Sequence, residues 1–142
     1  MSPLRTLALV GVLLLLPVAS PAQTTGLDAL QGRWIVTGAE AGGEPFGTVV
    51  GGVLTIVGAD FTIRTAAGTV LTGTLAADAA ATPPALDLLH ADGARWAAIF
   101  AIDGSRLRLT YVVADGTATR PGAFDTGGNM LATRIDLERR DP

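Results

Sequence analysis

Apolar and polar residues alternate along most of the chain with the period of two that is typical of half-buried β-strands. The alternation is clearest in the segment 95–113, RWAAIFAIDGSRLRLTYVV. Asp103-Gly104 in its middle predicts a β-hairpin, because this dipeptide tolerates the two positive φ angles of a type I′ turn. With that dipeptide as the whole loop, the pairs expected on one apolar face are Phe100 with Leu107, Ala98 with Leu109 and Trp96 with Tyr111.

A second hairpin is predicted over the segment 53–65, with Gly58-Ala59 as its turn. This turn places apolar residues opposite one another on one face and polar residues opposite one another on the other face. The expected partners are Leu54 with Ile63, Ile56 with Phe61, Thr55 with Thr62 and Val53 with Arg64.

Four further strands are predicted over residues 33–40, 69–76, 85–89 and 130–139, the last with Leu131 and Ile135 facing inward. Residues 26–31 suit one helical turn that ends at Gly32, and Gly73 is expected to mark a bulge or kink. Eight short strands with tight turns indicate an all-β fold, either a sandwich or a barrel. We expect a small eight-stranded antiparallel up-and-down barrel, because consecutive hairpins close naturally and closure leaves no exposed edge.

The first residues have the pattern of a secretory signal peptide. A short basic stretch, 1–5, precedes the apolar run 7–16, and Ser20-Pro21-Ala22 supplies the small residues of a cleavage site. The apolar run is shorter than the roughly 20 residues of a membrane span. We therefore expect a signal peptide over 1–22, a barrel domain over 23–142, and a secreted or periplasmic protein that is not membrane-embedded after cleavage.

The composition narrows the classes of function. The formal net charge is −3 and the chain has no cysteine. An acidic chain without a basic cluster is not expected to bind nucleic acid. Without cysteine there are no disulfides, so packing alone must hold the fold.

Candidate catalytic chemistry is sparse because His90 is the one histidine in the sequence. Asp87, His90 and Asp92 form D-x-x-H-x-D, which offers two or three metal ligands. Strand alternation places Asp87 on the face opposite His90, however, so the three side chains do not converge unless the strand ends at Leu89. We therefore expect a solvated strand end, no cofactor or metal, and no enzymatic activity.

Six short motifs together resemble a known family. They are LQGRW (30–34), GADFT (58–62), GTL (73–75), TPPALDL (82–88), FAIDGSRLRL (100–109) and RPGAF (120–124). They are similar to the lipocalin-like domain of exported bacterial proteins that is abundant in planctomycetes, a functionally uncharacterised family. The resemblance implies a calycin-type barrel. It also implies that Trp34, in the G-x-W entry of lipocalins, plugs one end, with Arg134 as the arginine packing over it.

An eight-stranded barrel either fills its interior with side chains or holds one small ligand. Ala98 and Gly73 leave room inside, so we expect non-catalytic binding of a small apolar ligand, with a filled core as the alternative. The predicted cavity lining is Trp34, Leu54, Ile56, Phe61, Trp96, Ala98, Phe100, Leu109 and Tyr111. A second hypothesis is a protein-interaction or protease-inhibitor-like module that binds a protein partner through loops 41–51 and 115–129.

Overall fold

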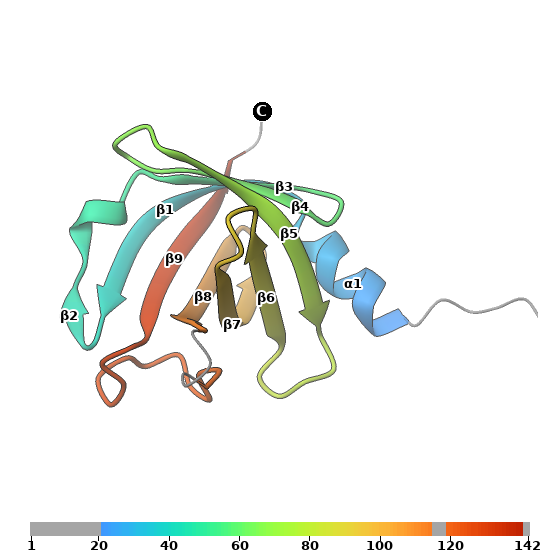
Figure 1. The fold of residues 1–142 in the computed structure, drawn as a ribbon. Coiled ribbons are helices and arrows are strands. Elements are labelled where there is room, and N and C mark those ends of the chain that lie inside the picture. The colour runs from blue at the N-terminus through green and yellow to red at the C-terminus, as the bar shows by residue number, and fades with distance from the viewer. Residues whose placement is uncertain (1–20, 115–118, 141–142) are drawn as a thin grey trace, which may run out of the picture.

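The computed structural model describes residues 21–114 and 119–140 and forms an antiparallel β-barrel with one N-terminal helix (Figure 1). Residues 1–20 of the predicted signal peptide lie outside this part of the chain, as do residues 115–118 of the predicted second loop. The elements are α1 (Pro21–Leu30), β1 (Gly32–Ala41), β2 (Glu44–Pro45), η1 (Gly47–Val49), β3 (Val53–Val57), β4 (Asp60–Arg64), β5 (Val70–Asp78), β6 (Ala85–His90), β7 (Arg95–Asp103), β8 (Arg106–Val113) and β9 (Thr133–Arg140).

Eight strands, β1 and β3 to β9, close the barrel. Each pairs antiparallel with the next in chain order, and β1 also pairs with β9 over its length. The two-residue β2 only extends the end of β1. The predicted eight-stranded up-and-down barrel is therefore confirmed. Because the barrel is closed, each of the eight strands pairs with a neighbour on both sides.

The structure confirms the predicted register of one hairpin and corrects that of the other. The β3–β4 hairpin has the predicted register, with Leu54 opposite Ile63 and Ile56 opposite Phe61. In the β7–β8 hairpin the loop is Gly104-Ser105 instead of Asp103-Gly104, so the predicted cross-strand partners are wrong. The observed pairs are Ile102 with Leu107, Phe100 with Leu109, and Ala98 with Tyr111.

The turn residues explain this correction. Gly104 has a φ of +58° and Ser105 has a negative φ. Positive φ at the first of two loop positions is the pattern of a type II′ turn, which takes glycine there, whereas type I′ needs it at both. The shift is two residues along the strand, so every side chain keeps its predicted face.

Two smaller predictions are also wrong. Gly73 is no bulge, since it pairs regularly with Phe61 on one side and His90 on the other. The ladder irregularity lies instead in β1, between Val36 and Gly38. The last strand begins at Thr133, and Leu131 is 70% exposed, because residues 119–132 cross the outside of the barrel before β9 begins.

Residues 119–132, which we call the strap, cover the outer face of β6, β7 and β8. Arg120 donates hydrogen bonds to the carbonyl oxygens of Leu86 and Ala98 at 3.2 and 2.7 Å. Thr110 donates to the Phe124 carbonyl at 3.1 Å. The strap explains why outward-facing residues of β7 and β8 are buried: Ala97, Ile99, Thr110 and Val112.

Candidate ligand cavity

The end of the barrel next to α1 is filled. Trp34 is fully buried there, and its indole Nε1 donates a hydrogen bond to the Leu30 carbonyl at 2.9 Å. The guanidinium of Arg139 lies 4.3 Å from the centre of the Trp34 ring. Arg139 also donates to the carbonyl oxygens of Ala29 and Gln31 at the end of the helix. These contacts attach α1 to the barrel and close this end.

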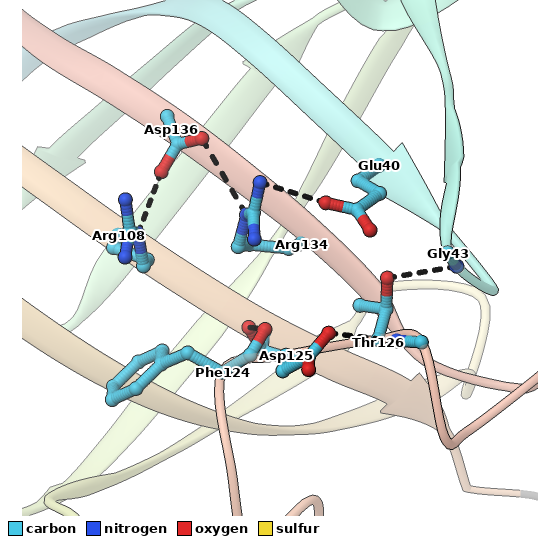
Figure 2. Close-up of polar contacts among 10 residues, drawn as sticks. Glu40, Gly43, Arg108, Phe124, Asp125, Thr126, Arg134 and Asp136 are labelled. Carbon is cyan, nitrogen blue, oxygen red and sulfur yellow. Dashed lines mark hydrogen bonds and ion pairs between the residues drawn. The ribbon is translucent and has the colours of Figure 1, made fainter.

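The arginine over Trp34 is therefore Arg139, and the assignment to Arg134 is wrong. Arg134 lies on the outer face, because alternation along β9 gives the two residues opposite directions. There it forms ion pairs with Glu40 at 2.8 Å and with Asp136 at 3.6 Å (Figure 2). Asp136 in turn pairs with Arg108 at 2.8 Å, so the network links β1, β9 and β8.

A row of aromatic rings crosses the inner face from β4 to β8. Ring centres are 5.1 Å apart for Phe61 and His90, and 4.3 Å apart for His90 and Trp96. Trp96 and Tyr111 stack almost in parallel at 4.2 Å. Gly73 makes the row continuous across β5, because a Cβ there would stand 2.7 Å from the Phe61 ring and overlap the Leu89 carbonyl oxygen.

His90 is buried, so its prediction as a solvated strand end is wrong. Its side chain lies on the inner face between Phe61 and Trp96 and is only 6% exposed. Its Nε2 atom has no hydrogen-bond partner among the described residues. Burial lowers the pKa of His90, and the nearby Asp92 carboxylate partly opposes this effect. His90 is therefore neutral at neutral pH.

Asp87, the first residue of the D-x-x-H-x-D motif, has a structural role. It faces outward and accepts from Arg120 at 2.6 Å and from Arg95 at 3.3 Å. The three motif residues therefore do not converge. Within the described part of the chain, no group of three or more His, Asp or Glu side chains is placed to hold a metal ion.

The other end of the barrel holds a cavity of about 330 Å³. Side chains of β1 and of β3 to β9 form its walls. Residues of η1 and of the β4–β5 turn also line it, at its mouth. Val36 belongs to the wall while Trp34, two residues earlier in β1, does not. The cavity therefore lies beyond Trp34, away from α1. None of its described lining residues carries a charged side chain.

The structure divides the nine residues predicted to line a cavity into two groups. Leu54, Trp96, Leu109 and Tyr111 lie in the cavity wall. The other five are buried in the barrel core outside that wall: Trp34, Ile56, Phe61, Ala98 and Phe100. Burial raises the pKa of Tyr111, and a hydrogen bond with Thr133 partly opposes this, so the phenol in the wall is uncharged at neutral pH.

Sequence reasoning missed several wall residues. Leu71 and Leu88 occupy alternate positions of predicted strands, so periodicity alone would have identified them. Thr48 and Val49 of η1 also line the cavity. No periodic signal marks them, since a short 3₁₀ turn in a Gly-rich loop is placed only by its contacts with β1.

The two predicted interaction loops contact each other beside this end of the barrel. The amide of Gly43 donates to the Thr126 hydroxyl at 3.0 Å (Figure 2). Thr126 of the second loop is fully buried, while Phe46 and Val50 of the first loop are exposed. Met130 and Leu131, which directly follow the second loop in the strap, are also exposed apolar residues.

Comparison with protein-family models, with curated proteins and with solved structures finds no match to this chain. Of the helices in residues 21–114 and 119–140, none has the length and apolar character needed to span a membrane.

Proposed function

We propose that this protein is an exported, lipocalin-like carrier that binds one small apolar molecule in its barrel, without catalysis. The observation that supports this most directly is the apolar cavity of about 330 Å³ at one end of a barrel whose other end is filled. Small-molecule sites in proteins are concave, mostly apolar and about 300–1,000 Å³ in volume. The Trp34–Arg139 contact at the filled end supports the lipocalin-like assignment.

The wall of the cavity is held in place before any ligand binds. One face of Trp96 contacts Tyr111 and the other contacts His90, so its ring has little freedom to collapse into the space. Rigid walls lower the ordering cost of binding, because fewer side-chain rotamers are lost.

The test is a titration with phenylnaphthylamine, a neutral dye whose fluorescence rises in apolar surroundings. We expect one saturable site on the exported protein purified without detergent. The double variant Ile63→Trp/Ile135→Trp narrows the cavity and should lose most of the signal. The matched control Val57→Trp/Leu131→Trp places the same rings at positions that are 70% exposed and should bind as the wild type does.

Native mass spectrometry of the same preparation provides an independent readout. A discrete extra mass that disappears on denaturation would identify a resident ligand. Equal dye binding by the cavity variant and its control would contradict the proposal, because it would place the dye elsewhere.

The exposed apolar residues of the two contacting loops favour a second candidate, binding of a protein partner at this end of the barrel. Phe46 lies on the first loop and is 36% exposed, and Met130, which directly follows the second loop, is 81% exposed. If this candidate is right, a protein should co-purify with the wild type and be lost in Phe46→Ser/Met130→Ser. The control Val57→Ser, on the β3 strand, should retain it. Absence of any partner in the wild type would count against this candidate and leave the cavity proposal unaffected.

A further inference from the structure

We propose that the barrel cavity selects electrically neutral apolar molecules and rejects carboxylates, including fatty acids of the same size. The inference rests on the proposed ligand-binding function and specifies its ligand class. It follows from the uncharged wall of the cavity and from the positions of the arginine side chains on β8 and β9.

The cavity offers no partner for a ligand charge. Its wall consists of apolar side chains together with the neutral polar groups of Thr48, Thr65 and Tyr111. Moving an ionised carboxylate from water to such surroundings without a counter-ion costs several kcal/mol or more. A neutral hydroxyl or carbonyl costs far less, and a threonine or tyrosine hydroxyl can satisfy it.

Arg139, an inward-facing arginine of β9, already has its own partners. It lies at the opposite end, over the Trp34 ring. Its guanidinium donates to two helix carbonyls, which fix its position. Arg108 and Arg134 face outward and pair with Asp136 and Glu40 (Figure 2). None of these cations is placed to neutralise an anion in the cavity.

The two titratable groups of the aromatic row add no charge at neutral pH. Tyr111 lies in the wall, and its pKa is raised by burial. His90 lies behind Trp96, and burial lowers its pKa. A histidinium there would attract a carboxylate, but the neutral ring does not.

The test compares octanol with octanoate, which have the same chain length and differ in charge at pH 7.5. Each is used to displace phenylnaphthylamine from the exported protein. We expect octanol to displace the dye at a concentration at least about tenfold lower than octanoate, which corresponds to a difference of about 1.4 kcal/mol. Octanoate that displaces the dye as well as octanol would overturn the inference and leave the ligand-binding function in place.

A variant pair tests the electrostatic cause. Leu71→Lys introduces a cation at a half-buried wall position of β5, near the mouth, where the lysine stem can lie along the apolar wall. Thr72→Lys adds the same charge to the outer face. We expect Leu71→Lys to bind octanoate more tightly than the wild type and Thr72→Lys to leave the preference unchanged. An equal gain in both variants would show that surface charge, not the cavity, governs the preference.

The wild-type comparison decides the inference even where Leu71→Lys does not fold, as judged by circular dichroism. A protein that binds neither the dye nor octanol would instead overturn the proposed function, and the inference with it. The two outcomes are therefore distinguishable in one experiment.

Discussion

At the scale of single residues, two positions on β5 and β6 shape the interior. Gly73 leaves the space that the Phe61 ring occupies, and the His90 ring makes a T-shaped contact with that ring. Among the residues that the structure describes, the His90 Nε2 atom has no hydrogen-bond partner. A buried polar atom without a partner costs about 1–3 kcal/mol. The sequence alone does not predict that Gly73 and His90 lie directly opposite each other on β5 and β6.

Replacing His90 should alter the dependence of stability on pH. Because the folded-state pKa of His90 is lowered, the unfolded chain binds the proton more readily, and stability is lost as pH falls below about 6.5. We expect His90→Phe to remove this part of the loss and to be more stable at pH 7.5 by about 1 kcal/mol. Urea unfolding of both proteins at pH 7.5 and 5.5 measures the effect, and an equal loss in both would contradict it.

A methyl group at Gly73 should be poorly tolerated. Gly73→Ala places a Cβ 2.7 Å from the Phe61 ring and against the Leu89 carbonyl, so the backbone must move. We expect a loss of about 3 kcal/mol in the free energy of unfolding. Gly47→Ala is the matched control, since no atom lies within 4 Å of its added Cβ. Similar unfolding midpoints for the two variants would show that the close approach at Gly73 is unimportant.

At the scale of elements, the strap makes this barrel different from a simple eight-stranded one. It covers the outside of β7 and β8 and is held at Arg120, Phe124 and Thr126. Alternation predicts that the outward residues of these strands are solvated. Ile99 and Val112 are buried instead, because an irregular segment with no periodic signal packs over them.

Removing the Arg120 guanidinium should detach the strap. Arg120→Ala removes the side-chain hydrogen bonds to the carbonyl oxygens of Leu86 and Ala98 and the shorter ion pair of Asp87. We expect a loss of about 2 kcal/mol in stability and faster proteolysis within the strap. Arg95→Ala removes the other, half-exposed partner of Asp87 and should cost less than about 1 kcal/mol. Equal losses in the two variants would assign the effect to charge alone.

At the scale of the whole molecule, one end of the barrel is filled and the other is hollow. Trp34, Arg139 and α1 close the first end, whereas short loops surround the second. A ligand that fills the hollow end should stabilise the folded state, because it binds that state and not the unfolded chain.

Ligand-linked stabilisation is the corresponding prediction. Phenylnaphthylamine at about 100 times its Kd should raise the free energy of unfolding by about 2.7 kcal/mol, seen as a higher Tm. The Ile63→Trp/Ile135→Trp variant should show no such shift. A shift of the same size in that variant would mean that the dye stabilises the protein from outside the cavity.

The sequence by itself determined the fold class, the strand order and the faces of the residues in the two predicted hairpins. These follow from local alternation and from turn glycines such as Gly58, which carry their information within a few residues. In the β7–β8 hairpin it determined the faces but not the register. A period of two is unchanged by a shift of two, and only the φ angles at Gly104 and Ser105 distinguish the two loops.

Only the tertiary structure decided which arginine packs on Trp34, which outward residues the strap buries, and which end of the barrel is hollow. Each of these depends on contacts between segments far apart in the chain. Alternation along β9 turns Arg139 inward and Arg134 outward, and only the register of β9 against β1 brings Arg139 opposite Trp34. The cavity likewise is the space left after strands, helix and loops have packed, so no single segment encodes it.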